Sequence, residues 1–361
     1  MTGDDLEPID PEPGAALARL DPEWRFAQAR SRRSAWILAA VVGAGLAVSV
    51  AIAITTRSGH HRPAPTTSAA TPVNRLTSLV TELQMGLHGL GSGRYAAVID
   101  GRLYILDGTQ PAATLVPLPK GHAVIQDQSG SSLLLSTFEQ TLVSTRPVRT
   151  RTLSPRETPI RAIAPKTWWL LRNDGTIRSD ERGPTRRVPA GLRIVAVVRE
   201  GFVALDAPDF RWVISSGSTI RKIAPSGYQL LTVGPRTVVF KHSCGYDGCA
   251  VEILGLAHGA IATSRLPVVL QFAALSPNGK LLALASTRGD VFILDAKTGG
   301  LVVQVQSVHT QNSSLPFTWT ADSRALIVVG THDVQVLRAG DGFATSIIAK
   351  TGGLEQLVAL P

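Results

Sequence analysis

Two cysteines and a nearby histidine are the most reactive side chains that lie close together in this sequence. Cys244 and Cys249 are the only cysteines, and they flank a turn in the segment HSCGYDGC, which begins at His242. The glycines and the aspartate between them favour a tight reversal of the chain, so we expect the two thiols to face each other across a hairpin. In an oxidising compartment this spacing predicts a disulfide. The alternatives are a metal site formed by His242 and both thiols, which lacks a fourth ligand at a recognisable spacing, and an unpaired, inert pair of thiols.

The sequence holds none of the common catalytic or cofactor-binding motifs. A nucleophile elbow needs Gly-x-Ser-x-Gly, a phosphate-binding loop needs Gly-x-x-x-x-Gly-Lys and a zinc helix needs His-Glu-x-x-His, and none of the three occurs. The eight histidines are scattered along the chain. We therefore expect no catalytic residue, no metal site and no cofactor.

Arginines are concentrated around a pair of tryptophans, Trp168 and Trp169. Arg172, Arg186 and Arg187 follow closely in the sequence, and further arginines lie on both sides of them. Arginine together with exposed tryptophan is typical of interface hot spots and of grooves for anionic polymers. These five residues form the predicted binding surface. The alternative is that they are ordinary solvated residues of turns and loops.

A long apolar segment near the N-terminus predicts a membrane anchor. From Ala35 to Ile54 the chain has twenty residues without a charge, and a helix of that length spans the roughly 30 Å hydrocarbon core of a bilayer. Arg30, Arg32 and Arg33 lie just before this segment and Trp36 lies at its start, which predicts a cytoplasmic N-terminus and an extracytoplasmic C-terminus. A signal peptide cleaved near residues 51–53 is the alternative.

These features divide the chain into four predicted regions. Residues 1–34 form a cytoplasmic tail that is largely disordered, residues 35–55 a transmembrane helix, residues 56–73 a stalk rich in Pro, Thr and Ser, and residues 74–361 an extracytoplasmic domain. Small residues recur every fourth position on one face of the membrane segment, which would allow a homodimer through the transmembrane helix. The predicted location is therefore the cell membrane, with a single pass.

The positive charge of the chain belongs to the predicted outer domain. The net charge is +9, the tail contributes five arginines and seven carboxylates (−2), and the stalk contributes Arg57 and Arg62 (+2), which leaves +9 on residues 74–361. Outside the cell this charge favours anionic lipid headgroups and anionic wall polymers. Nucleic acid is not an expected partner in that compartment.

The C-terminal region contains an internal repeat. One copy has a turn at residues 276–279, an apolar run, a second turn at residues 288–290 and a second apolar run that ends at Asp295. Alignment of Ser276 with Thr320 and of Asp290 with Asp333 gives a period of 43–44 residues. A period of this length is typical of four-stranded propeller blades.

The repeat resembles the blades of WD-repeat-like and quinoprotein-like β-propellers of bacterial proteins. Leu294 stands where such blades often have the Trp of a Trp-Asp pair. The residues that carry the resemblance are Ser276, Pro277, Gly279, Lys280, Ala283, Gly289, Val291, Ile293, Asp295, Thr298 and Gly299. The resemblance implies an all-β fold, a β-propeller of four-stranded blades. Fainter copies between Gly101 and His332 give six intervals in 231 residues, so about seven blades fit best and six or eight remain open. We expect this propeller to follow the single N-terminal transmembrane helix. Such a ring closes by pairing its end strands, and we expect residues 344–349 or 357–360 to pair with a strand near residues 76–83.

The expected function is that of a non-catalytic binding module, which is not an enzyme, anchored outside the membrane. Its predicted partner is a protein or an anionic envelope polymer, an inference by analogy from the propeller architecture. One alternative is a propeller enzyme of the quinoprotein or lyase type, which would need aromatic residues and carboxylates converging on a channel mouth. The other is a transmembrane sensor that couples ligand binding outside to the N-terminal tail.

Overall fold

The computed structural model describes residues 72–90, 93–109, 113–118, 121–137, 139–163, 167–179, 185–305 and 316–361. The predicted tail, transmembrane helix and stalk lie outside the described residues, and so do Arg30, Arg32, Arg33 and Trp36. Within the described part of the chain, no helix is long and apolar enough to cross a membrane. The contacts separate Met1–Ala69 from the compact unit Ala70–Pro361, and the description below concerns the second unit.

The described residues form short β-strands, together with one α-helix, α2 (Pro72–His88), and a 3-10 helix, η2 (Ala339–Asp341). The strands, in chain order, are β1 (Arg94–Ile99), β2 (Arg102–Asp107), β3 (Thr114–Leu115), β4 (Val124–Ser129), β5 (Ser132–Ser136), β6 (Gln140–Thr145), β7 (Val148–Thr152), β8 (Glu157–Ala162), β9 (Trp168–Arg172), β10 (Thr176–Ser179), β11 (Arg186–Arg187), β12 (Leu192–Val198), β13 (Gly201–Asp206), β14 (Arg211–Ser216), β15 (Thr219–Ala224), β16 (Gln229–Val233), β17 (Thr237–Gly245), β18 (Gly248–Gly255), β19 (Gly259–Leu266), β20 (Leu270–Leu275), β21 (Leu281–Ser286), β22 (Val291–Asp295), β23 (Leu301–Val305), β24 (Phe317–Trp319), β25 (Ala325–Val329), β26 (Asp333–Arg338), β27 (Ala344–Lys350) and β28 (Leu354–Leu360).

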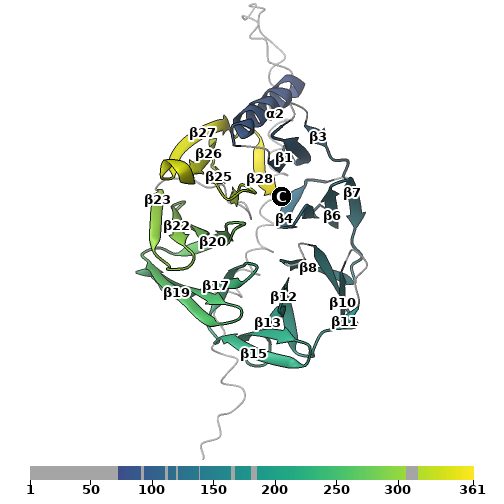
Figure 1. The fold of residues 1–361 in the computed structure, drawn as a ribbon. Helices are drawn as coiled ribbons and strands as arrows, with labels where there is room; N and C mark the ends of the chain where they lie inside the picture. Colours follow the sequence, from purple (N-terminus) through teal and green to yellow (C-terminus); the bar gives the residue numbers. More distant parts are fainter. Residues whose placement is uncertain are drawn as a thin grey trace, which may run out of the picture. The chain divides into compact units, whose positions relative to one another are not determined.

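The strands form antiparallel sheets arranged in a ring (Figure 1). Five sheets of the described part have four strands, and a sixth has eight strands in the order β11-β10-β9-β8-β12-β13-β14-β15. A short parallel contact between β8 and β12 joins the two halves of the eight-stranded sheet. In Figure 1 strands such as β4, β8 and β12 lie near the centre of the ring, whereas β7, β15, β19 and β27 lie on its rim. This arrangement is that of a β-propeller, and the all-β fold with four-stranded sheets is confirmed.

The ring closes through the C-terminal strand. β28 pairs with β1 in antiparallel register, with Arg94 opposite Leu360 and Ala97 opposite Leu357. Of the two predicted closing segments, residues 357–360 do close the ring, whereas residues 344–349 do not, because they lie in β27, which pairs with β26. The predicted partner of the closing strand is wrong, because residues 76–83 lie in helix α2. The apolar residues of that segment recur with the period of a helix and not with that of a strand.

Each sheet is buried on both faces, because it packs between two neighbouring sheets. Along β1, Tyr95 and Ile99 belong to an apolar cluster that includes Ile327 of β25. The intervening Val98 belongs to another cluster, which includes Leu133 of β5. Successive side chains of a strand point to opposite faces, so this alternation links every sheet to the next one in the ring.

The two copies of the repeat have equivalent turns. Ser276 Oγ donates to Asn278 Oδ1 at 2.8 Å and accepts a bond from the backbone N–H of Leu281 at 2.9 Å. In the second copy Thr320 Oγ1 donates to Asp322 Oδ1 at 2.7 Å and accepts from the N–H of Ala325 at 3.0 Å. The alignment of Ser276 with Thr320 is therefore confirmed at the level of hydrogen bonds.

Candidate functional site

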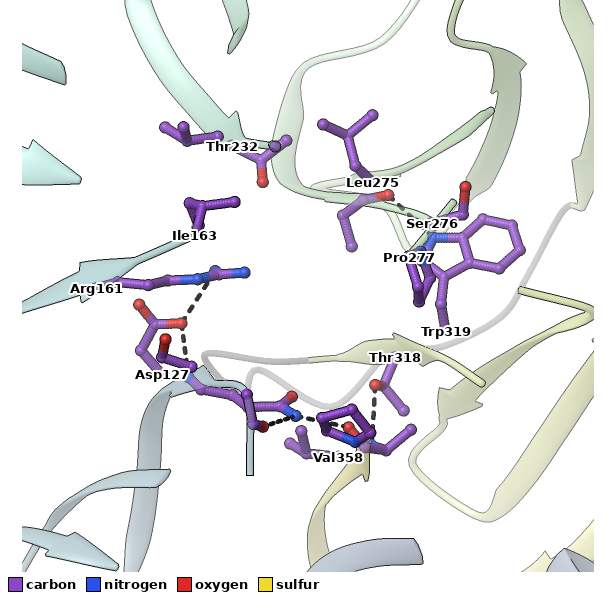
Figure 2. Close-up of a pocket in the computed structure, with 18 of the residues that line it drawn as sticks. Asp127, Arg161, Ile163, Thr232, Leu275, Ser276, Pro277, Thr318, Trp319 and Val358 are labelled. Atoms are coloured by element: carbon purple, nitrogen blue, oxygen red, sulfur yellow. Dashed lines mark hydrogen bonds and ion pairs between the residues drawn. The ribbon is translucent and has the colours of Figure 1, made fainter. Parts of the chain in front are cut away.

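A pocket of about 240 Å³ lies at the centre of the ring (Figure 2). Its lining comes from the C-terminal halves of the inner strands β4, β8, β16, β20, β24 and β28, and from the turns that follow them. Because these strands belong to six different sheets, residues far apart in the sequence meet here. The pocket therefore exists only in the closed ring.

An ion pair between Asp127 of β4 and Arg161 of β8 forms one side of the pocket. Arg161 Nη1 donates to Asp127 Oδ1 at 3.1 Å, and the same oxygen accepts from the backbone N–H of Gln128 at 2.7 Å. These two are the charged side chains among the described lining residues. Burial raises the pKa of Asp127, although the neighbouring guanidinium opposes this effect. About 33% of the Asp127 side chain is exposed, so water screens part of this charge.

The opposite side of the pocket is mainly apolar. In Figure 2 Leu275, Pro277 and Trp319 face the ion pair across the cavity. The Trp319 indole N–H donates to the backbone carbonyl of Ala274 at 3.0 Å, and Thr318 Oγ1 accepts from the N–H of Ala359 at 3.0 Å. The polar atoms of this wall are thus engaged with neighbouring strands, which leaves the ion pair as the polar feature of the site.

Sequence patterns indicated only part of this pocket. Arg161 belongs to the arginine-rich stretch, but nothing in the pattern around Asp127 distinguishes it from other polar residues near turns. The pairing of the two residues depends on the packing of β4 beside β8, and no local pattern predicts it.

The predicted binding surface is not assembled as expected, because both tryptophans are buried. Trp168 packs with Leu134 and Leu142 of the preceding sheet. Trp169 faces the other way and makes an edge contact with Phe202, with ring centroids 6.2 Å apart. The predicted surface requires exposed tryptophan, whereas a blade strand has a neighbouring sheet on both sides, so both rings are covered.

The arginines of that surface lie at the rim of the ring. Arg186 and Arg187 form β11 and are exposed, whereas Arg172 at the end of β9 is half-buried. The Arg186 guanidinium lies 5.3 Å from the centroid of the Trp169 ring, a cation–π contact. Arg149 of β7 is also exposed. Among the described residues, neither Arg149 nor Arg187 has a carboxylate partner within ion-pair distance.

Charge is distributed unevenly around the ring. Residues 139–199, which we name the basic sector, contain twelve Arg and one Lys against five carboxylates, a net charge of +8 out of the +9 on residues 74–361. The sector spans β6 to β12, so it covers one side of the ring in Figure 1. The remaining sheets are close to neutral.

The two cysteines form a disulfide at the turn between β17 and β18, with their Cα atoms 4.1 Å apart. His242 lies nearby, but its ring is stacked on Tyr228 with the centroids 4.2 Å apart. Both sulfurs are therefore bonded to each other and do not serve as metal ligands with His242. In the described part of the chain, no group of three His, Cys, Asp or Glu residues is placed to hold a metal ion.

Comparisons with known proteins give similarities of fold. No family model matches the chain, and no curated protein matches it. The structure of apo AztD from Citrobacter koseri aligns at 10% identity over 75% of this chain and 98% of its own, with a TM-score of 0.47. The C-terminal WD40 domain of Sif2 aligns at 15% identity over 67% of this chain and 76% of its own (TM-score 0.42). Kluyveromyces lactis Hsv2 aligns at 14% identity over 60% of this chain and 73% of its own (TM-score 0.40). Likenesses at this level carry no argument about function, and the fold assignment rests on the arrangement of the sheets.

Proposed function

We propose that this chain is a membrane-anchored, extracytoplasmic β-propeller that acts as a non-catalytic binding module for an anionic envelope polymer. The proposed propeller has seven four-stranded blades, and two of them form the eight-stranded sheet, which divides between β8 and β12. The observation that carries it is the concentration of charge, since the basic sector holds +8 of the +9 net charge of residues 74–361. A charge imbalance of this kind attracts a polyanion to one side of the molecule.

The rim arginines supply the contacts. Arg149 and Arg187 are exposed on the outer strands β7 and β11, which lie in neighbouring sheets (Figure 1). Guanidinium groups bind phosphate and carboxylate through two parallel hydrogen bonds. A polymer with repeated anionic groups can engage several of them at once, and each contact adds a modest free energy.

The proposed location rests on two features. The uncharged segment 35–54 is long enough to span a bilayer. The disulfide between Cys244 and Cys249 is a bond that persists in oxidising compartments. Both agree with a domain outside the cytoplasm.

The test is a binding titration of the full-length protein, in detergent, with fluorescent polyphosphate and fluorescent polyglutamate as probes. Removal of three rim charges by Arg149→Ala, Arg186→Ala and Arg187→Ala together should weaken binding by about tenfold, because each exposed contact contributes roughly 0.5 kcal/mol. The salt dependence of the Kd should become shallower in this triple variant.

The matched control removes three exposed arginines outside the basic sector: Arg236→Ala, Arg288→Ala and Arg324→Ala. This variant should bind within about twofold of the wild type. Equal losses of affinity in both triple variants would show that binding depends on the net charge alone. Capture of an acidic protein that resists high salt would instead support the protein partner.

A further inference from the structure

We propose that the central pocket binds a small organic carboxylate, with Arg161 as the residue that holds its carboxylate group. This site is separate from the rim arginines and goes beyond the proposed polymer binding. Three features of the pocket carry the inference: the hydrogen-bonding state of Arg161, the charge around it and the shape of the opposite wall.

Arg161 has more hydrogen-bond donors than its protein partners use. A guanidinium carries five N–H groups, and among the described residues Arg161 makes one side-chain bond, from Nη1 to Asp127. Its Nε–H is buried with no acceptor, and about 40% of its side-chain surface remains exposed to the pocket. The Nε–H is not reachable from the pocket, but a carboxylate can accept two parallel bonds from a guanidinium, so it matches the donors on the exposed part of this group.

The electrostatics favour an anion over a cation. Asp127 is the counter-charge of Arg161, but its Oδ1 already accepts two hydrogen bonds. Burial also raises its pKa, which is the direction expected for a carboxylate that is poorly stabilised as an anion. Arg161 itself belongs to the basic sector, whose +8 charge repels cations from this side of the channel.

The wall opposite Arg161 determines which group attached to the carboxylate fits the pocket. Leu275, Pro277 and Trp319 face Arg161 across the pocket (Figure 2) and offer an apolar surface. The volume of about 240 Å³ is smaller than the roughly 300–1,000 Å³ of sites that take drug-sized ligands. The pocket therefore suits a short aliphatic acid or an acid with a single ring.

The experiment measures binding of benzoate and hexanoate to the full-length protein by calorimetry, with benzylamine and hexylamine as cationic counterparts of the same shape. Both acids should bind the wild type at millimolar concentration or below, and neither amine should compete. Arg161→Gln should weaken acid binding at least about tenfold, or 1.4 kcal/mol. Asp127→Asn keeps the hydrogen-bond acceptor but removes the competing charge, so it should tighten acid binding several-fold.

Two further variants separate the site from general effects. Thr232→Phe places a ring in the pocket from β16 and keeps both members of the ion pair, so it should abolish binding even if Arg161→Gln fails to fold. Arg324→Gln removes a surface charge and should leave the affinity within about twofold. The proposal is overturned if the wild type binds neither acid, if Arg161→Gln and Thr232→Phe bind as the wild type does, or if the amines bind and Asp127→Asn abolishes that binding. The variant with the three rim substitutions should bind both acids normally, which distinguishes this site from polymer binding.

Discussion

At the residue scale, Tyr95 brings a phenolic hydroxyl into the apolar core where α2 covers the ring. Only 1% of the residue is exposed, and its hydroxyl has no hydrogen-bond partner among the described residues. Burial raises the pKa of Tyr95 to about 12, with a further contribution from the Asp322 carboxylate. The aromatic ring of Tyr95 packs in the apolar core and stabilises it, whereas the unpaired hydroxyl lowers the free energy of unfolding.

We expect Tyr95→Phe to leave the free energy of unfolding unchanged or to raise it by up to about 1 kcal/mol, because it keeps the ring and removes an unsatisfied polar group. The effect should depend on pH. Since the pKa of Tyr95 is higher in the folded protein than its usual value of 10, the tyrosine ionises first in the unfolded chain, so stability that is present below pH 10 is lost as the pH rises toward 12. Urea titrations at pH 8 and pH 11 should therefore show a steeper loss for the wild type than for the variant. A large loss of stability in Tyr95→Phe at pH 8 would mean that the hydroxyl makes a stabilising bond.

At the scale of elements, helix α2 covers the junction where the ring closes. Leu83 and Leu87 are fully buried in a cluster that also contains residues of β1, β26 and β28. Glu82 Oε1 accepts a bond from the backbone N–H of Lys350 in β27 at 3.0 Å. At Gly86 the helix comes so close to β27 that an added Cβ would lie 2.6 Å from the carbonyl oxygen of Ile348. The helix is thus docked on the propeller through a face that requires a glycine.

We expect Gly86→Ala to destabilise the protein by about 1–3 kcal/mol, since the new methyl group forces α2 away from β27. In an exposed helix the same change would stabilise by about 1 kcal/mol, so the sign of the effect reports the docking. Met85→Ala is the control, because Met85 is 68% exposed and its loss should change stability by no more than about 0.5 kcal/mol. Chemical denaturation of both variants measures this. A more stable Gly86→Ala protein would show that α2 does not pack on β27.

At the scale of the whole molecule, the C-terminal strand β28 completes the sheet formed by β1, β2 and β3, the first three strands of the propeller. β28 is the end strand of the sheet β28-β1-β2-β3 and lies at the centre of the ring, where Leu354, Leu357 and Leu360 are buried. It also connects two blades, because the Gln356 amide accepts from the N–H of Ile125 at 2.6 Å and donates to its carbonyl at 3.0 Å. The closing strand β28 therefore completes the sheet that contains β1 and also bonds to the neighbouring sheet that contains β4.

Removal of residues 354–361 should open the ring and abolish the single cooperative unfolding transition, because β1 loses its inner partner and two apolar clusters lose one wall. Hydrogen exchange should report the loss first in β1, and a peptide of residues 354–361 added in trans should restore part of the protection. Gln356→Leu is the milder comparison: loss of its two hydrogen bonds to the Ile125 backbone should cost about 1–3 kcal/mol and leave the ring intact. Unchanged exchange in β1 of the truncated chain would contradict this account of closure.

Features that depend on neighbours in the sequence could be predicted without the structure. The turns that begin at Ser276 and Thr320, the strands on either side of them and the position of the closing strand follow from turn residues and from the alternation of apolar side chains. The proximity of Cys244 and Cys249 follows in the same way, since a hairpin of a few residues places the two side chains close together. The sequence by itself thus determined the repeat and, through it, the class of fold.

Features that depend on which sheets become neighbours were decided only by the tertiary structure. Trp168 and Trp169 are both buried because a blade lies on each side of β9, and β1 rather than residues 76–83 receives the closing strand because α2 occupies the outside of that junction. Asp127 and Arg161 meet because β4 and β8 converge on one channel. A local pattern specifies which face of a strand is apolar, but the partner of that face is set by closure of the ring, where contacts join residues hundreds of positions apart.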